Sequence, residues 1–355
     1  MRSRLILQSA YAFGCALAIG CASGGETTGA GGAAAGGSGG STTTSSSATA
    51  SSSSGDFDAG SGTGGSEGPV LIYAHTDDTL FLLDPESDTL ALTQVGKFGC
   101  VDDGTIFSMT DFAVDRGEQI WGISAYAVHP LQVNGAAVAC GAEIALQIPQ
   151  ELRFYGMTFA PIGVIDPATE VLVAGNNGGE LWAISESGQL NLRGNFGMVP
   201  MDDGQGHSYK ATHVNKPFGL SGDIVFLANG DNPVGFATVR DCLIPAETND
   251  CSTVNTLIEI DVPKLANMNN TESVRKSIRG QIVKRPGCAD GTDGLYGNMY
   301  GIAAWKDKVY GFSRSGYIVE IDTTDGTACQ VVPNTGLKFA GAGVTTLAPI
   351  VPPPE

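Results

Sequence analysis

The chain contains few basic residues. It has 19 Lys and Arg against 37 Asp and Glu in 355 residues, a formal net charge of −18. Every acidic residue follows the N-terminal Arg2 and Arg4, so removing that segment would leave a charge of about −20. Nucleic-acid phosphates require Lys and Arg, so we expect no nucleic-acid partner. We also expect no direct adhesion to anionic lipid unless divalent cations bridge the two surfaces.

Recognisable catalytic motifs are also absent. Beyond Gly68 the sequence has no Gly-x-Ser-x-Gly, no phosphate-binding Gly-Lys-Ser/Thr loop and no dinucleotide fingerprint. Residues 36–40 and 64–68 spell Gly-x-Ser-x-Gly, but both lie in a low-complexity region. A nucleophile elbow requires a strand before it and a helix after it. The sequence therefore assigns no catalytic residue.

The N-terminal apolar stretch, residues 5–19, is too short to span a membrane, which takes about 20 residues. It follows Arg2 and Arg4 and precedes small residues, so residues 1–20 are predicted to be an export signal. Residues 18–21, Ala-Ile-Gly-Cys, resemble the lipobox of bacterial lipoproteins, although the usual leucine falls one place early, at Leu17.

The lipobox resemblance implies a lipid anchor on Cys21. Cys15 is the weaker candidate, and an ordinary secretory signal is the alternative. If the enteric sorting rule applies, the absence of Asp after Cys21 points to the outer membrane. We therefore expect an exported cell-envelope lipoprotein, periplasmic or surface-facing.

The segment after Cys21 has no apolar periodicity. Residues 22–68 are almost entirely Gly, Ser, Thr and Ala, and such a segment cannot bury enough apolar surface to offset its ordering entropy. Residues 21–68 are therefore predicted to be a disordered tether with a reach of about 35–40 Å. Residues 351–355 form a short Pro-rich tail.

A recurring turn phrase organises the remainder, residues 69–350. Its three copies are Lys-Phe-Gly-Cys-Val-Asp-Asp-Gly at 97–104, Asn-Phe-Gly-Met with Asp-Asp-Gly at 195–204, and Arg-Pro-Gly-Cys-Ala-Asp-Gly at 285–291. Each copy lies between two apolar alternating runs. Such repetition indicates a repeat architecture.

The clearest repeat, residues 300–332, contains four short alternating runs separated by Gly- and Asp-containing turns, as expected of a four-stranded meander. The pattern recurs at 111–124, 157–193 and 217–284, the last with an insertion at 229–255 and a possible helix within 262–279. Residues 70–95 lack a first strand, which residues 343–348 are predicted to supply. We expect an all-β, single β-propeller of five four-stranded blades, or six if the middle section contains another.

The runs Leu-Phe-Leu-Leu-Asp-Pro at 80–85 and Leu-Trp-Ala-Ile-Ser at 181–185 resemble those of bacterial extracytoplasmic β-propellers. The resemblance covers Pro69 to Ile350. It implies the fold but no function, because propellers include enzymes, lectin-like binders and scaffolds.

Six cysteines remain after Cys15 and Cys21 are set aside. In an exported chain this even number predicts disulfides. Two pairs have similar spacing and begin in equivalent Gly-Cys-x-Asp positions, and the third closes a short loop. The predicted pairs are Cys100–Cys140, Cys288–Cys329 and Cys242–Cys251; buried free thiols are the alternative.

Acidic turns offer a candidate calcium site, because carboxylate and carbonyl oxygens are the ligands that calcium prefers. The spacing does not match an EF-hand, and Asp-Gly is a common tight turn. Turn formation is therefore the favoured interpretation over calcium binding. The candidate residues are Asp102, Asp103, Asp202, Asp203, Asp290 and Asp293.

Histidines and tryptophans give weaker signals. His207 and His213 match no zinc spacing and are expected in surface loops. His75, near Asp77, could act as a general base, but the sequence supplies no nucleophile. The three tryptophans are expected in packing between blades rather than in sugar stacking; they are Trp121, Trp182 and Trp305.

The favoured function is non-enzymatic binding of a protein or glycan, with the stapled insertion at 229–255 as the leading loop. The alternative is a polysaccharide hydrolase. Five-bladed propellers include glycosidases that place three carboxylates around the central channel, and similarity to them would require acids at the starts of the innermost strands. Of the expected starting residues only Asp111 fits; the others are Met157, Pro217 and Met299. A spacer without a ligand is a third possibility, and oligomeric state is not indicated.

Overall fold

A computed structural model describes residues 71–148, 152–227, 232–242, 250–289, 294–306 and 308–348. The predicted signal, Cys21, the tether and the Pro-rich tail lie outside these ranges, as do Asp290 and Asp293. Within them, no helix is long and apolar enough to cross a membrane. The described residues all belong to one compact unit.

Three separate four-stranded antiparallel sheets account for the second half of the chain. The first contains β9 (Phe154–Ala160), β10 (Val171–Asn176), β11 (Glu180–Ile184) and β12 (Leu190–Asn195). The next contains β13 (Phe218–Leu227), β14 (Val234–Asp241), β15 (Thr256–Ile260) and β16 (Arg275–Gln281). The last contains β17 (Met299–Trp305), β18 (Lys308–Ser313), β19 (Ile318–Ile321) and β20 (Ala328–Val332).

A larger sheet contains two such four-stranded groups. One consists of β21 (Gly341–Gly343), β1 (Ile72–His75), β2 (Thr79–Leu83) and β3 (Leu92–Phe98). The other consists of β4 (Asp111–Val114), β5 (Ile120–Ile123), β6 (Ala127–Asn134) and β7 (Ala137–Cys140), with β8 (Ile144–Ala145) beside β6. A short parallel pairing of β3 with β7 joins the two groups.

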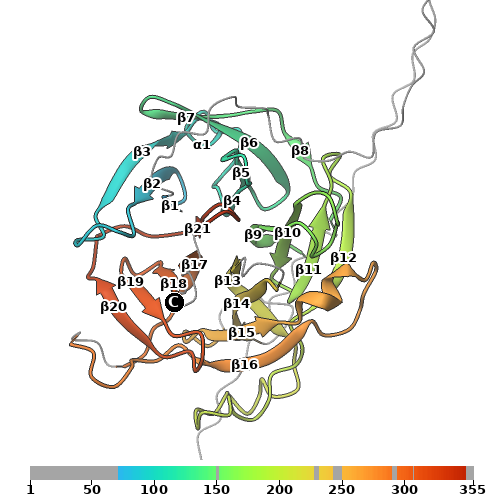
Figure 1. Ribbon diagram of the computed structural model, residues 1–355, viewed down its shortest axis with the longest axis vertical. Helices are drawn as coiled ribbons and strands as arrows, with labels where there is room; N and C mark the ends of the chain where they lie inside the picture. Colours follow the sequence, from blue (N-terminus) through green and yellow to red (C-terminus); the bar gives the residue numbers. More distant parts are fainter. Residues whose placement is uncertain are drawn as a thin grey trace, which may run out of the picture. The chain divides into compact units, whose positions relative to one another are not determined.

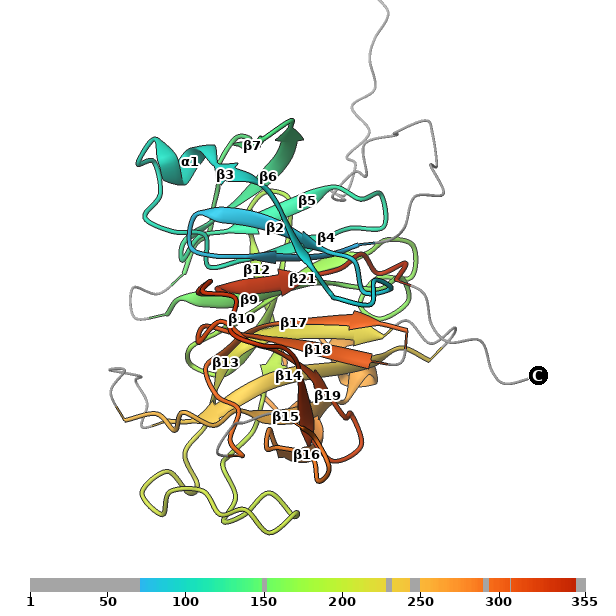
Figure 2. The same cartoon turned by 90° about the vertical axis from the view of Figure 1, so that its left-hand side faces the viewer.

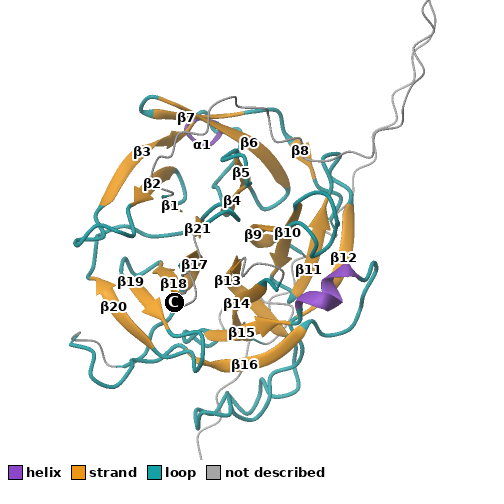
Figure 3. Ribbon diagram, viewed as in Figure 1, coloured by secondary structure: helices purple, strands orange, loops and turns teal. Residues whose placement is uncertain are grey.

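The sheets lie around a common centre, with β21, β4, β9, β13 and β17 innermost (Figure 1). Each of these strands contacts its neighbours in the ring. Figure 2 shows the same strands from the side. Helix is confined to α1 (Gly99–Asp102) and the 3₁₀ helix η1 (Val262–Ala266) in the described part (Figure 3). The architecture is a β-propeller, as predicted.

The two ends of the described chain meet in one sheet, which closes the ring. β21 pairs antiparallel with β1, with Ala342 opposite Ala74. The strand lies slightly earlier than the predicted 343–348, because Thr345 instead forms an isolated bridge with Val114 and begins a turn. Closure by a C-terminal strand is therefore confirmed, and the residue range of that strand is corrected to 341–343.

The boundaries around β13 were predicted wrongly. Residues 217–220 and 223–228 were expected to be two strands, but 218–227 form the single strand β13, with a register shift between Leu220 and Ile224. The intervening Ser-Gly-Asp is a bulge rather than a turn. The second strand of this sheet is β14, which lies inside the expected insertion.

The outer edge of the same sheet also differs from prediction. The expected helix within 262–279 is limited to η1, and β16 occupies residues 275–281 in place of the expected fourth strand at 281–284. β16 is polar because it is outermost, and its Lys276 and Arg279 both pair with Glu259 of β15.

Inner strands pack directly on one another where glycine removes the side chain. A β-carbon on Gly222 would overlap the carbonyl oxygen of Met299, one on Gly301 would overlap the backbone of Ala342, and one on Gly156 would crowd the carbonyl oxygen of Gly222. This close backbone approach is a use to which glycine is suited. The packing leaves little width for a channel at these positions.

All three predicted disulfides are present. Cys100–Cys140 joins α1 to β7, Cys242–Cys251 closes the β14–β15 connection, and Cys288–Cys329 joins the segment after β16 to β20. The equivalent placement of the first and third pairs matches the repeat from which they were predicted.

Candidate functional site

A cavity of about 880 Å³ opens on one face of the propeller, where loops from several sheets converge. Three connections form most of its wall: residues 76–79 between β1 and β2, 107–110 between β3 and β4, and 336–340 between β20 and β21. Tyr155 of β9 and Tyr300 of β17 add half-exposed aromatic rings. The cavity therefore collects residues from distant parts of the sequence.

An Arg–Asp pair spans this cavity wall. Arg314 donates from Nη1 to Asp77 Oδ1 at 3.0 Å and from Nη2 to Asp77 Oδ2 at 2.8 Å. The guanidinium also lies 5.6 Å from the centre of the Tyr300 ring. Hydrogen bonding to Asp77 raises the pKa of Arg314. This bidentate geometry fixes both side chains at the mouth of the cavity.

Asp78, beside this pair, is committed to its own loop. Its Oδ1 accepts hydrogen bonds from the hydroxyls of Thr76 at 3.0 Å and Thr79 at 2.9 Å. Burial pushes the pKa of Asp78 upward, but these hydroxyls and Lys97 outweigh it, so the pKa is lowered. The carboxylate remains ionised and shapes the loop.

A buried polar layer lies directly beneath the cavity. Thr76, Thr110 and Ala340 line the cavity, and the residues next to them in sequence are His75, Asp111 and Gly341. His75 Nε2 lies 3.7 Å from Asp111 Oδ1, and both side chains are fully buried. A β-carbon on Gly341 would overlap both side chains.

Asp111 belongs to a buried carboxyl pair with Asp223 of β13. Asp111 Oδ2 accepts from the Met157 N–H at 2.6 Å, and Asp223 Oδ2 accepts from the Ile302 N–H at 3.3 Å. Burial raises the pKa of both carboxyls well above the usual value. Each carboxyl thus ties an inner strand to that of the next sheet.

Burial lowers the pKa of His75 to about 4. Its Nδ1 is 2.7 Å from the Thr76 carbonyl oxygen, so the neutral ring donates there. A side chain with no solvent exposure cannot reach a substrate in the cavity above. His75 therefore serves packing and hydrogen bonding rather than the general-base role that was considered.

The acidic turn residues are separated rather than gathered. In the described residues, no group of three or more His, Cys, Asp or Glu is placed to hold a metal ion. Asp103 and Asp202 each accept from the N–H two residues ahead, at 2.8 and 2.9 Å. Asp102 is exposed and 3.9 Å from Lys97. Turn formation accounts for Asp103 and Asp202, whereas Asp102 ends helix α1; calcium binding stays a prediction.

Asp203 is a buried junction between two sheets. Its carboxylate accepts from the N–H groups of Gln205 at 2.8 Å, His207 at 3.0 Å and Gln281 at 2.9 Å. The His207 ring adds a contact at 2.9 Å. Burial opposes the ionised form, but these hydrogen bonds lower the pKa of Asp203. The second acidic turn therefore connects the loop between β12 and β13 to the end of β16.

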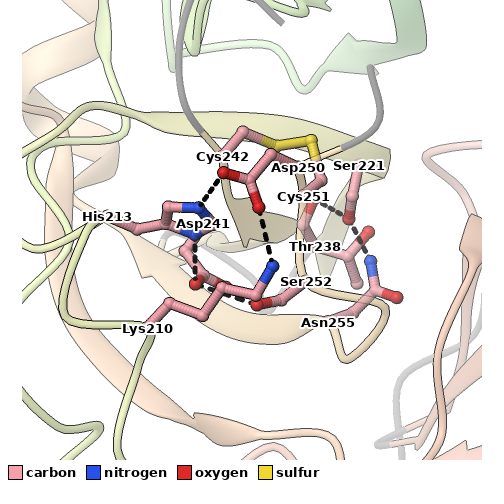
Figure 4. Close-up of a disulfide and its surroundings, with 10 residues drawn as sticks. All are labelled: Lys210, His213, Ser221, Thr238, Asp241, Cys242, Asp250, Cys251, Ser252 and Asn255. Atoms are coloured by element: carbon pink, nitrogen blue, oxygen red, sulfur yellow. Dashed lines mark hydrogen bonds and ion pairs between the residues drawn. A yellow bond between two sulfur atoms is a disulfide. The ribbon is translucent and has the colours of Figure 1, made fainter. Parts of the chain in front are cut away.

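His213 is buried, in contrast to the surface position expected of it. Its Nδ1 lies 2.8 Å from Asp241 Oδ2, and its Nε2 lies 3.5 Å from Asp250 Oδ2 (Figure 4). Ser252 donates to the same Asp241 oxygen at 2.9 Å. Because the serine bonds to the aspartate rather than to the imidazole, this is not a nucleophile–base pair.

The stapled connection packs against this group. Lys210 pairs with Asp250 at 3.0 Å, so the residue before Cys251 is held by both Lys210 and His213 (Figure 4). A small cavity of about 300 Å³ adjoins it, lined in part by Asp241, Cys251 and Ser252. The described part of the expected insertion consists mainly of β14 and this anchored segment; residues 229–231 and 243–249 lie outside the described part.

The tryptophans serve packing. Trp305 is 5% exposed within a hydrophobic cluster. Trp121 and Trp182 pack against another cluster, and their indole N–H groups face Asp115 at 3.4 Å and Glu180 at 3.1 Å. The aromatic residues that line the cavity are instead Phe81, Phe107, Tyr155 and Tyr300. Sequence patterns did not identify Tyr300 or Arg314 as cavity residues. The Arg314–Asp77 pair in particular joins residues 237 positions apart in the sequence.

Comparisons with known proteins are uninformative about function. No protein-family model matches the chain, and no curated protein matches it in sequence. A solved protein of unknown function from Bacteroides caccae shows 10% identity and a TM-score of 0.37, over 78% of this chain and 99% of that one.

Two other solved structures are similarly distant. The Dos1 propeller shows 8% identity and a TM-score of 0.32, over 74% of this chain and 54% of that one. BBS1N, solved in complex with ARL6DN, shows 10% identity and a TM-score of 0.32, over 72% and 63%. Scores this low carry no argument, so the β-propeller assignment rests on the sheet topology described above.

Proposed function

We propose that this chain is an envelope lipoprotein whose five-bladed propeller binds a ligand without transforming it. Five four-stranded groups around one centre support the blade number. The lipid on Cys21 and the tether would hold the propeller away from a membrane surface, with the outer membrane as the expected location. Binding would take place in the cavity between the 76–79, 107–110 and 336–340 loops.

A glycan is the ligand that this cavity suits best. Two half-exposed tyrosine rings offer apolar faces, while Gln94 and Ser108 offer neutral hydrogen-bonding groups. A site that combines apolar walls with a few polar groups is typical of small-molecule binding. The observation that carries the proposal is this convergence of aromatic rings and neutral polar side chains on one face.

The test is binding of cell-envelope glycans to the full chain, measured by calorimetry. Tyr300→Ala and Tyr155→Ala should each weaken binding about 5- to 100-fold, by analogy with other stacked rings. Tyr126→Ala is the matched control, because Tyr126 is 46% exposed and does not line the cavity. Equal affinities in all three variants would contradict the proposed site.

The hydrolase alternative receives little support from the carboxyl groups. Glycoside hydrolysis needs two accessible carboxyl groups flanking the scissile bond. In the cavity wall Asp77 is bound by Arg314 and Asp78 by threonines, while Asp111 and Asp223 lie fully buried. Release of reducing ends from an envelope polysaccharide, abolished by Asp77→Asn, would revive this alternative.

A protein partner is a second candidate, because the loops of the same face expose apolar side chains. Phe107 is 99% exposed, Met201 75% and Leu295 52%. Phe107 and Leu295 each follow one copy of the recurring turn phrase, and Met201 lies within another copy. Cross-linking in the intact envelope should capture a defined protein in the wild type and lose it in Phe107→Ser if this candidate is correct.

Anchoring has its own test. Cys21→Ser should abolish incorporation of labelled fatty acid and release the chain from the membrane fraction. Retention of the label would contradict lipidation at Cys21, with Cys15 then the residue to examine.

A further inference from the structure

A second cavity, of about 660 Å³, lies at the opposite ends of the strands from the first. Its wall comes from the β9–β10 connection, the β11–β12 turn and, at and just after the C-terminal end of η1, Ala266 and Met268. In an antiparallel meander these connections lie at the end opposite to the β1–β2 and β3–β4 connections that line the first cavity. The two cavities are therefore separate sites.

Arg193 of β12 lines this second cavity and is 8% exposed. Its Nη1 donates to the carbonyl oxygens of Leu265 at 3.3 Å and Ala266 at 3.4 Å, at the end of η1. Its Nε is buried without a hydrogen-bond partner. A guanidinium has five N–H donors, and two long bonds from one nitrogen leave most of them unused.

No carboxylate among the described residues forms an ion pair with Arg193. Burial is the cause that lowers the pKa of Arg193. Acidic residues outnumber basic ones almost twofold in this chain, so potential partners are plentiful. A buried charge without a partner is costly, and a site that retains one is a candidate for binding an opposite charge.

The acids in the same wall are already engaged. Asp166 accepts from the N–H groups of Ala168 at 2.8 Å and Thr169 at 3.0 Å. Glu170 accepts from the Arg116 N–H at 2.8 Å and from the Thr346 hydroxyl. Neutral side chains of Ser185, Gln189 and Asn191 complete the polar wall.

We propose that this second cavity binds a carboxylate-bearing ligand, with Arg193 as the residue that receives the carboxylate. A planar guanidinium can bind a carboxylate through two parallel hydrogen bonds, which would use donors that Arg193 leaves free. Gln189 and Asn191 would hydrogen-bond the rest of the ligand. The site is independent of the glycan cavity and does not depend on the function proposed for it.

A purely structural role for Arg193 makes a different prediction. In that role the side chain only holds the last two carbonyls of η1, as Arg275 holds the carbonyl oxygens of Phe196 at 3.3 Å and Met198 at 2.9 Å. Arg275 also lies over the Phe218 ring and does not line the second cavity. Arg275→Gln is therefore a matched control for Arg193→Gln.

The experiment compares carboxylates with their neutral counterparts by NMR titration of the full chain in detergent. The probe pairs are glucuronate with glucose, and N-acetylglycine with N-acetylglycinamide. We expect a carboxylate to bind more tightly than its neutral counterpart, and Arg193→Gln to weaken that binding at least about tenfold. Arg275→Gln should leave it unchanged.

Preference for glucuronate would identify an acidic sugar as the ligand class, and preference for N-acetylglycine would identify a peptide carboxylate; both support the proposal. If neither carboxylate binds the wild type better than its neutral counterpart, the proposal is wrong. It is also wrong if folded Arg193→Gln keeps full affinity. If Arg193→Gln fails to fold, Arg193→Lys replaces it in the experiment. Lysine retains the positive charge but lacks the planar guanidinium.

Discussion

Single buried residues set the chemistry of the propeller centre. Gly341 allows the C-terminal strand to approach His75 and Asp111, since any β-carbon would overlap both side chains. Asp111 and Asp223 in turn hold inner strands of neighbouring sheets through backbone N–H groups. The centre is thus stabilised by a few polar groups that have no contact with solvent.

Gly341→Ala should destabilise the fold by about 1–3 kcal/mol or more, because a β-carbon must displace the His75 or Asp111 side chain. Urea unfolding monitored by tryptophan fluorescence measures the change. Gly99→Ala is the control: its β-carbon would make only an ordinary contact with the Val138 carbonyl oxygen. Equal stability of the two variants would show that strand β21 is not tightly packed.

The Asp111–Asp223 pair should make stability depend on pH. Because burial raises the pKa of both groups, the folded chain retains protons that the unfolded chain releases above about pH 4. This contribution is complete below that pH and declines as the pH rises toward the raised values. Asp111→Asn should therefore flatten the decline in unfolding free energy that begins above about pH 4.

The titration of His75 has the opposite effect on the pH dependence of stability. His75 is present in both the wild type and the Asp111→Asn variant. Its pKa is lowered to about 4, so its contribution is present above about pH 6.5 and is lost as the pH falls through about 4. The two contributions are distinguished by their opposite signs, because His75 Nε2 lies 3.7 Å from Asp111 and its surroundings also change in Asp111→Asn. Asp88→Asn, at an exposed position, is the control; parallel pH profiles for all three proteins would contradict the argument.

At the scale of elements, disulfides hold the connections that strand pairing leaves weak. Cys100–Cys140 closes a separation of 40 residues and Cys242–Cys251 one of 9. Chain-entropy estimates give about 4 kcal/mol for the longer loop and about 3 kcal/mol for the shorter one. The double Cys→Ser variant of the longer pair should accordingly be the less stable of the two.

Chemical unfolding of the two double variants at one pH measures this order. The short loop also carries Asp250, which pairs with Lys210 and His213. If the Cys242/Cys251 variant loses more stability than the Cys100/Cys140 variant, those ionic contacts depend on the disulfide.

Element boundaries show where sequence patterns are reliable. The clearest repeat, residues 300–332, became β17 to β20 nearly as predicted, since each turn there coincides with Gly or Asp. The prediction for the β13 sheet was wrong because the Ser-Gly-Asp bulge within β13 has the same composition as a turn. β16 was missed because an outermost strand can be polar on both faces when charged pairs such as Lys276–Glu259 stabilise it.

At the scale of the whole molecule, ring closure couples the two ends of the domain. β21 pairs with β1, and Arg314 of the last sheet binds Asp77 of the first. Removing residues 341–355 should leave β1 as an exposed inner edge and abolish a single cooperative unfolding transition. Differential scanning calorimetry measures this; an unchanged transition would show that closure contributes little.

The cavity proposed for binding is likewise a property of the closed ring. Tyr155, Tyr300 and the loop at 336–340 lie far apart in the chain and meet because the ring brings the ends of their strands together. No local pattern marks them, since each residue type is ordinary in its own repeat. Sequence analysis therefore directed attention to the stapled insertion, much of which proved to be strand β14.

Local patterns determined the repeat, the all-β architecture, the three disulfides and the closing C-terminal strand, because alternation, turn residues and cysteine spacing act over short distances or recur. Only the tertiary structure decided which carboxyls are buried, where inner strands touch and which loops share a cavity. Those properties arise from contacts such as Asp77–Arg314 and Asp111–Met157. Such contacts join distant residues, and their energies depend on burial that no single segment encodes.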